Sequence, residues 1–167
     1  IDTCAPMLAH ARSKAAETNA RLAWVQADVE YLPVRSGTIA AITMSFALRH
    51  MHVKAVLGEM SRVLAPGGWL ALLEFLRPSG GLVPWLALVY LRWVVPPLAG
   101  LLARSRMACM LAAYLPRTIA IAPSPQELVE TARSAGLHAT RVESLFARVV
   151  WLIVAAKPPR ESIEVRE

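Results

Sequence analysis

Two side chains that can handle protons or negative charge stand together at Arg49 and His50, directly after an apolar, β-rich run at 39–46. A guanidinium holds its proton too tightly to act as a base, but Arg49 can stabilise negative charge on an oxygen or orient a water. A histidine at the next position can accept a proton. The alternatives are an arginine that pairs with a carboxylate at the strand end and a histidine that lies on the surface.

Two aspartates are candidates for holding a polar ligand. Asp2 falls where a strand ends, and an acidic side chain there can accept both ribose hydroxyls of a nucleoside. Its alternative role is to cap the helix that starts near Pro6. Asp28 follows a short apolar strand at 22–26, and its alternative role is to form a turn. Ser45 is, taken alone, an ordinary serine at a strand end.

The elements that must position these residues alternate along the chain. Helical spacing of apolar residues predicts helices at 6–18, 53–64 and 125–135, the last with Ser124 as N-cap, Glu127 three residues later and Gly136 at its end. Apolar or alternating segments predict strands at 22–26, 39–46, 69–75, 137–144 and 148–156. Strands that are apolar on both faces and alternate with helices belong to a buried parallel sheet, so we expect an α/β domain whose last two strands pair antiparallel.

The turn between the second helix and the strand at 69–75 is Pro66-Gly67-Gly68. It must reverse a helix that packs on the sheet. We expect its two glycines to permit positive φ angles where a side chain would clash.

Residues 82–103 are apolar apart from Arg92, over about the length that spans a bilayer. A charge near the centre and prolines at 84, 96 and 97 count against a spanning helix. We therefore expect a pair of helices that forms a lid and rests on a membrane, with a single spanning helix as the alternative.

The bulk composition indicates one folded domain. Of 167 residues, 56% are hydrophobic and 18% charged, which excludes a disordered chain. The net charge of +6 comes from scattered lysines and arginines, and it favours an anionic membrane surface slightly over nucleic acid. Cys4 and Cys109 match no metal or redox spacing, so we expect reduced cysteines, no metal and a cytoplasmic protein. With the apolar segment at 82–103, we expect this protein to be peripheral on the inner face of the membrane.

Five stretches together resemble the class I S-adenosylmethionine-dependent methyltransferases. Within that class, the chain is most similar to the quinone-pathway C-methyltransferases that act on demethylmenaquinol and on polyprenyl benzoquinols. The stretches are IDTCAPML (1–8), WVQADVEYLP (24–33), ITMSFALRH (42–50), EMSRVLAPGGWLALLEFLRP (59–78) and YLPRTIAIAPSPQELVETARSAG (114–136). The resemblance implies a Rossmann-like sheet, mostly parallel with an antiparallel closing strand. It covers a partial methyltransferase domain at 1–158, with an apolar helical lid at 82–115 and a flexible charged tail at 159–167.

The resemblance implies S-adenosylmethionine as the cofactor and four residues that contact it. Asp2 would bind the ribose, Asp28 would accept the adenine amino group, the Val29 N–H would meet the ring, and Ser45 would be a further contact. Positioning the methyl group in line with its acceptor would supply most of the rate acceleration.

The resemblance also implies the substrate side of the site. Arg49 would lie beside the reacting ring of a polyprenyl quinol, where it could stabilise a phenolate, and His50 stands where the family usually has asparagine. Tyr114, Arg92 and the apolar lid would line a channel for the polyprenyl tail.

The family's first strand, glycine-rich loop and first helix have no counterpart in this sequence, because the glycine pairs Gly67-Gly68 and Gly80-Gly81 come too late. We therefore expect either an amino-terminally truncated chain or one completed by a partner or by a second copy. Two further hypotheses stay open: a methyltransferase of the same fold that acts on another lipid or small molecule, and a non-catalytic pseudo-methyltransferase or lipid-binding partner.

Overall fold

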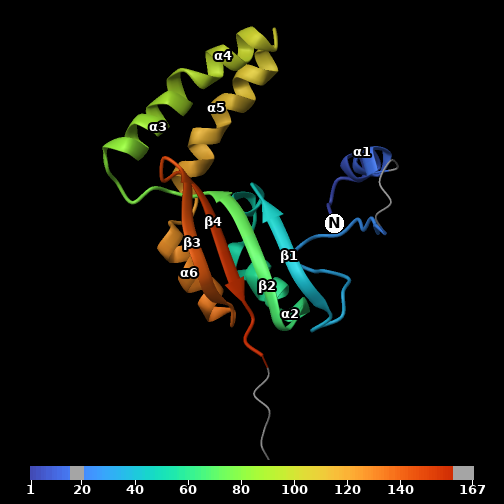
Figure 1. Ribbon diagram of the computed structural model, residues 1–167. Helices are drawn as coiled ribbons and strands as arrows, with labels where there is room; N and C mark the ends of the chain where they lie inside the picture. The colour runs from blue at the N-terminus through green and yellow to red at the C-terminus, as the bar shows by residue number, and fades with distance from the viewer. Residues whose placement is uncertain (16–20, 160–167) are drawn as a thin grey trace, which may run out of the picture.

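The computed structural model describes residues 1–15 and 21–159 (Figure 1). Its helices are α1 (Ala5–Ala15), the short 3-10 helix η1 (Leu48–His50), α2 (Val53–Val63), α3 (Leu82–Trp93), α4 (Val95–Leu102), α5 (Arg106–Ile121) and α6 (Pro125–Ser134). Its strands are β1 (Ile39–Ser45), β2 (Leu64–Phe75), β3 (His138–Phe146) and β4 (Val150–Ala156).

The strands form one mixed sheet in the order β1-β2-β4-β3. β1 runs parallel to β2, while β4 is antiparallel to both β2 and β3. The predicted antiparallel pair at the carboxyl end of the chain is therefore confirmed. β1 lies at the edge of this sheet, and within the described residues it pairs only with β2.

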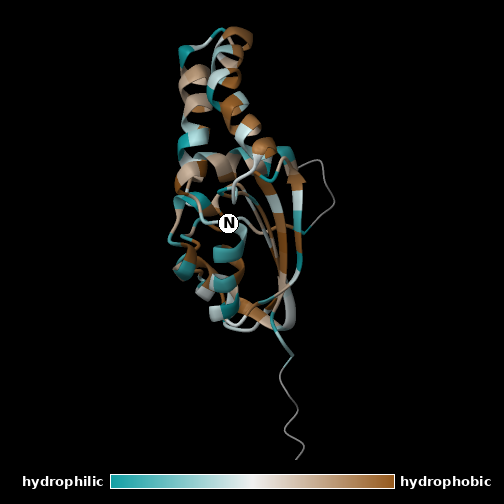
Figure 2. Cartoon of the chain, turned by 90° about the vertical axis from the view of Figure 1, so that its left-hand side faces the viewer, coloured by the Kyte–Doolittle hydropathy of each residue, from teal (hydrophilic) through white to brown (hydrophobic). Residues whose placement is uncertain are grey.

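The hydrophobic core lies between the sheet and two helices, α2 and α6, which cover the same face (Figure 1). Along β2 the side chains alternate: Leu70, Leu72 and Glu74 are buried, and the residues between them are only partly buried. The expectation of strands buried on both faces is thus wrong for β2, because the described helices cover one face of the sheet (Figure 2).

Two predicted strands have different bounds in the structure. The segment 22–26 forms no strand, and Gln26 makes only an isolated parallel bridge with Asp2. The strand predicted at 69–75 begins at Leu64, directly after α2, so the Pro-Gly-Gly turn belongs to β2. A short apolar run does not fix a strand, because pairing needs a neighbouring edge that local sequence does not reveal.

The two glycines of this turn serve different purposes. Gly67 has a φ of +78°, the conformation that the sequence predicted. Gly68 is required for a different reason, because the backbone of neighbouring residues comes too close for a side chain. An added Cβ would lie 2.8 Å from the Ala65 carbonyl oxygen and 2.9 Å from that of Ala40.

Helix α6 begins as the sequence predicts. The Ser124 hydroxyl accepts from the Glu127 N–H, and the Glu127 carboxylate accepts from the Ser124 N–H at 2.7 Å. Arg77 donates two further bonds to this carboxylate. The Ser124 N–H and then Arg77 hold the pKa of Glu127 below its ordinary value of 4.5.

The apolar segment forms a helical hairpin that stands away from the sheet (Figure 1). α3 and α4 follow one another with a break at Val94, and α5 returns alongside them. The expected pair of helices is therefore present, and α5 continues as far as Ile121. We call residues 82–121 the arm.

Helix α1 lies apart from the sheet on the other side of β1 (Figure 1). The sequence predicts an apolar face for it, yet none of its residues is buried, and Met7 is 57% exposed. Positions 16–18 of the predicted helix lie outside the described residues.

Candidate functional site

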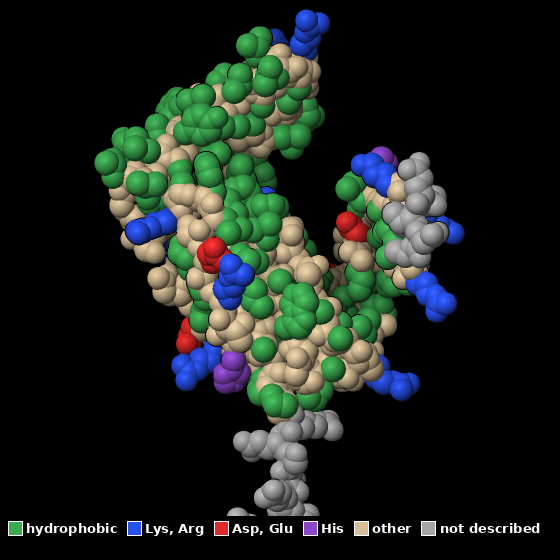
Figure 3. Space-filling view, viewed as in Figure 1, with side chains coloured by type: hydrophobic (Ala, Val, Ile, Leu, Met, Phe, Trp, Pro, Cys, Tyr) green, Lys and Arg blue, Asp and Glu red, His purple; other side chains and the backbone are tan. Residues whose placement is uncertain are grey.

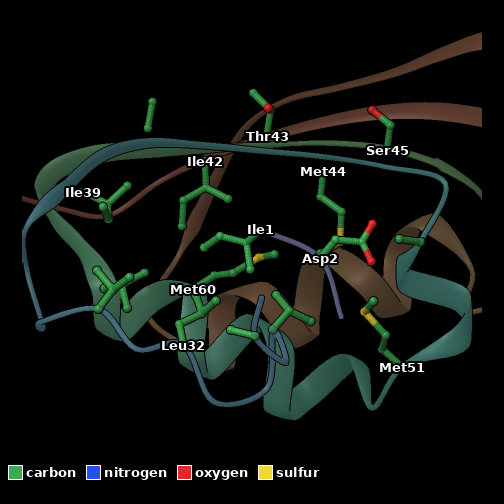
Figure 4. A pocket seen from close by; sticks show the side chains of 16 residues that line it. Ile1, Asp2, Leu32, Ile39, Ile42, Thr43, Met44, Ser45, Met51 and Met60 are labelled. Atoms are coloured by element: carbon green, nitrogen blue, oxygen red, sulfur yellow. The ribbon is translucent and has the colours of Figure 1, made fainter. Parts of the chain in front are cut away.

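A cavity of about 570 Å³ lies between β1 and the bridge that joins Asp2 to Gln26 (Figure 4). Its walls come from the first residues of the chain, the loop before β1, β1 itself and the inner face of α2. Asp2 is the only charged residue among those that line it. Its size suits a small organic ligand, and the space-filling view shows an open hollow between α1 and the sheet (Figure 3).

The alternation of β1 divides its side chains between two sides. Ile42 and Met44 point to the side where Asp2 lies, whereas the Thr43 and Ser45 side chains point to the opposite side of the strand (Figure 4). Ser45 thus borders the cavity at the strand end with its hydroxyl directed away from Asp2. Its predicted contact with the cofactor stays a prediction.

Asp2 is held in place by local hydrogen bonds. Its Oδ1 accepts from the Cys4 N–H at 2.8 Å, and its backbone pairs with the carbonyl of Val25 and the N–H of Ala27. The Gln26 side chain reinforces the bridge by donating to the Thr3 carbonyl at 3.0 Å. These bonds place a carboxylate at the cavity wall, as the ribose-binding role requires, and also give Asp2 a turn-forming role before α1.

The loop after this bridge brings Val29 to the cavity, whereas Asp28 is not among the lining residues. Asp28 Oδ1 accepts from the Glu30 N–H at 2.9 Å, which is the turn-forming role that the sequence left open. The loop is fastened to α2, because Glu59 accepts from the Leu32 N–H at 2.7 Å. A hydrogen bond from the neighbouring Arg62 holds the pKa of Glu59 below its ordinary value of 4.5.

Arg49, just beyond the carboxyl end of β1, forms a buried ion pair with Glu74 in the last residues of β2. The two atoms Nη1 and Oε1 are 2.7 Å apart, and the side chains are only 12% and 3% exposed. The other Glu74 oxygen accepts from the Leu48 N–H at 2.7 Å, and Arg49 Nη1 also donates to the Phe46 carbonyl. Arg49 Nε is buried and has no hydrogen-bond partner within the described residues. The pairing of Arg49 with a carboxylate is thus present, and one buried donor, the Nε–H, has no partner within the described residues.

The backbone turns sharply to make this arrangement. Phe46 has a φ of +55°, which is uncommon for a residue with a side chain, and its N–H donates to the Leu73 carbonyl at 2.8 Å. The chain then enters η1, which carries Leu48 and Arg49 back over β2. Backbone strain of this kind is frequent at functional sites.

Glu74 is a site residue that was not predicted from the sequence, although it is the single acidic residue within the apolar run at 69–75. A buried carboxylate is costly unless a cation and hydrogen-bond donors surround it, so its presence there implied a partner. Nothing local in the sequence indicated that the partner was Arg49.

The two other predicted substrate residues have separate locations. Tyr114 on α5 stacks on His50, with ring centroids 5.9 Å apart and an angle of 7° between the rings, so the arm meets the site here. His50 itself is exposed. Arg92 lies on α3 with its guanidinium 5.7 Å from the Trp93 ring centroid, and it does not line the cavity. The roles of Tyr114, His50 and Arg92 stay predictions.

The end of the cavity where Asp2 lies beside Met44 suits the nucleoside part of S-adenosylmethionine (Figure 4). It joins apolar walls, which suit a flat ring, to one carboxylate that can accept hydroxyls. No glycine is among its lining residues, so this part of the chain offers no glycine-rich loop to the amino-acid end of that cofactor.

The sequence profile of the ubiE/COQ5 methyltransferase family matches residues 1–157. Demethylmenaquinone methyltransferase of Thermus thermophilus is 35% identical over 158 residues, which cover 94% of this chain and 70% of the relative. The mitochondrial 2-methoxy-6-polyprenyl-1,4-benzoquinol methylase of Drosophila melanogaster is 34% identical over 134 residues, covering 80% of this chain and 44% of the relative. The chain therefore spans well under the full length of both.

Solved structures confirm the predicted fold class. A SAM-dependent methyltransferase from Aquifex aeolicus superposes with a TM-score of 0.58 at 14% identity, over 93% of this chain and 65% of that one. The [4+2]-cyclase SpnF gives a TM-score of 0.65 at 17% identity, over 94% of this chain and 64% of that one. At such identities the likeness shows a common Rossmann-like fold.

Proposed function

Because the chain belongs to the ubiE/COQ5 methyltransferase family, we propose that it serves the transfer of a methyl group from S-adenosylmethionine to a ring carbon of a polyprenylated quinol. The acceptor would be a demethylmenaquinol or a polyprenyl benzoquinol. The names of the relatives support this substrate class, and two of them act on these two kinds of ring.

The observation that carries the proposal is the buried Arg49–Glu74 pair at the carboxyl ends of β1 and β2. This pair lies near the cavity that Asp2 lines. Ligands of open α/β sheets bind outside the carboxyl ends of the strands. The cavity that would take the nucleoside therefore lies at the same edge of the sheet as the fixed guanidinium. The cofactor and the acceptor ring would meet at this edge.

S-adenosylmethionine supplies an electrophilic methyl group when it is bound. The residues of this chain would make the acceptor ring electron-rich and hold it in line. Arg49 would use its guanidinium charge to stabilise negative charge on a quinol oxygen, while Glu74 fixes the guanidinium. His50 is the group that can take up the phenolic proton, and its stacking on Tyr114 orients the imidazole ring.

The test compares Arg49→Ala and Arg49→Lys with the parent protein. Methyl transfer is measured with radiolabelled S-adenosylmethionine and a short-tailed demethylmenaquinol or benzoquinol, and the product is identified by mass spectrometry. We expect Arg49→Ala to lower kcat by roughly 10²- to 10³-fold while the affinity for S-adenosylhomocysteine changes little. Lysine keeps the charge but not the planar fork, so Arg49→Lys should recover only part of the loss.

The control is Arg12→Ala on α1, which removes an arginine outside the cavity. Equal loss of turnover and of cofactor affinity in Arg49→Ala would contradict the role of Arg49. Methylation of a different acceptor in a panel of lipids and small molecules would favour the alternative methyltransferase. Absence of S-adenosylhomocysteine binding by calorimetry would favour a non-catalytic lipid-binding role.

The expectation of a second copy or of a partner that completes the sheet also stays a proposal. β1 has only one paired edge within the described residues, and its other edge borders the cavity. Such an edge can accept a further strand. Light scattering of the purified protein would give the mass of the assembly, and a monomer mass would contradict the second copy.

A further inference from the structure

The arm carries 15 of the 25 large hydrophobic side chains that are exposed among the described residues. The exposed fraction is 68% for Trp93, 74% for Leu101, 63% for Met107 and 80% for Ile121. Only 6% of the most apolar stretch of α3 and α4 is buried. Figure 2 shows apolar residues along these helices, and Figure 3 shows their side chains over the surface of the arm. Monomeric soluble proteins rarely leave so large a contiguous patch uncovered.

The exposed side chains follow the helical repeat. Leu82, Leu86, Tyr90 and Trp93 are spaced by four, four and three residues, and each is at least 47% exposed, so they form one stripe along α3. Leu101 and Leu102 extend exposed apolar surface to the end of α4. The stripe holds a tryptophan and a tyrosine, the residues that favour the boundary between lipid and water.

The charge of the arm has one sign. Residues 75–126 contain no aspartate or glutamate, and the arm carries Arg92, Arg104, Arg106 and Arg117. Arg104 and Arg106 lie at the tip between α4 and α5, where Figure 3 shows cationic side chains. A protein partner would have to bury these charges against acidic groups, whereas an anionic bilayer meets them with its headgroups while the apolar stripe enters the acyl region.

The geometry counts against a helix that crosses the membrane. α3 and α4 together have the length and composition to do so, but they break at Val94, and Arg92 lies at the middle of the segment. α5 packs antiparallel against them. A short hairpin with cations along its length suits insertion into one leaflet, where the arginines reach the headgroups.

We propose that the arm is a docking surface for an anionic lipid bilayer, in which the α3–α4 stripe enters the headgroup boundary and the arginines contact lipid phosphates. The stacking of Tyr114 on His50 joins the base of the arm to the Arg49 site. Docking therefore presents that site to molecules dissolved in the membrane. This inference goes beyond methyl transfer and does not depend on it.

The experiment is flotation of the protein with vesicles of phosphatidylglycerol and phosphatidylcholine, and with vesicles of phosphatidylcholine alone, in the absence of cofactor and quinol. We expect partitioning onto the anionic vesicles that weakens with salt and with the removal of phosphatidylglycerol. Trp85→Ser/Trp93→Ser should lower the partition coefficient at least tenfold, because both side chains are more than half exposed. Arg104→Glu/Arg106→Glu should lose the preference for anionic vesicles.

Matched controls lie elsewhere on the chain. Trp69→Ser removes a tryptophan on β2 that is 44% exposed, and Arg12→Glu/Lys14→Glu reverses two cations on α1. Neither should change partitioning by more than about twofold, and circular dichroism would show that every variant is folded. Quenching of tryptophan fluorescence by brominated lipids should accompany binding of the parent and should be weaker in Trp85→Ser/Trp93→Ser, which keeps the chain's three other tryptophans.

Three outcomes would overturn the proposal: no flotation with anionic vesicles, equal flotation of the arm variants and the parent, or a dimer whose formation requires Trp85 and Trp93 without any vesicle binding. The last outcome would assign the arm to contact between copies. If methyl transfer to a short-tailed quinol in solution fails while flotation succeeds, only the proposed function is contradicted. If methyl transfer succeeds while flotation fails, only the proposed docking to the bilayer is contradicted.

Discussion

At the scale of single residues, the site depends on one buried ion pair. Glu74 accepts from Arg49, from the Leu48 N–H and from the Phe75 N–H, so one carboxylate fixes both the guanidinium and the turn that carries it. Two buried charges are tolerated here because each has its counter-charge and hydrogen bonds. Removing either one leaves the other without compensation.

Replacement of Glu74 by glutamine should lower the free energy of unfolding by about 3–5 kcal/mol, because the Arg49 charge would stay buried without a counter-charge. Urea denaturation gives this value, and kcat should fall together with it as the guanidinium loses its fixed orientation. Glu130→Gln on the exposed surface of α6 is the control and should change stability by less than about 0.5 kcal/mol. If the two variants are equally stable, the pair has no structural role.

At the scale of elements, helix ends are closed by bonds from distant parts of the chain. α2 ends where β2 begins, which leaves carbonyl groups at its last turn without helical partners. Lys157, just after β4, donates from Nζ to the carbonyls of Ser61 and Leu64 at 2.6 and 2.8 Å. A cation at the carboxyl end of a helix also interacts favourably with the partial negative charge that the helix dipole places there.

Lys157→Met should therefore lower the free energy of unfolding by about 1–2 kcal/mol, because it removes two charge-assisted hydrogen bonds but keeps the apolar stem. Thermal and urea denaturation would both report the change. Lys54→Met provides the comparison, since this exposed lysine lies in the first turn of the same helix, where a cation is unfavourable. A loss of stability in Lys54→Met as large as that in Lys157→Met would exclude the capping explanation.

At the scale of the whole molecule, stability is uneven. The core is formed by α2, α6 and the sheet, with β2 paired on both sides, whereas α1 buries nothing and the arm is largely exposed. Local opening is easiest where few apolar contacts must be broken. The cavity lies between the most and the least tightly packed parts of the described chain.

Hydrogen exchange followed by mass spectrometry should therefore find the slowest amides in β2 and β4 and the fastest helical amides in α1. The exchange in β2 should approach the global unfolding limit, since its strand is flanked by β1 and β4. Cofactor binding in the cavity should slow exchange at Asp2 and Val29 more than in α6. Protection of α1 equal to that of β2 would show that α1 is packed in solution.

The sequence by itself determined the elements whose signals are local. The apolar spacing of α2, the Ser124–Glu127 capping box and the alternating β3–β4 pair depend on residues within a few positions of one another, and all were predicted. Tertiary structure alone decided that Glu74 holds Arg49, that the segment 22–26 makes a single bridge and that the helices of the described chain cover one face of β2. Those features join residues far apart in the chain, and their energies depend on which edge or charge lies opposite, which no local pattern specifies.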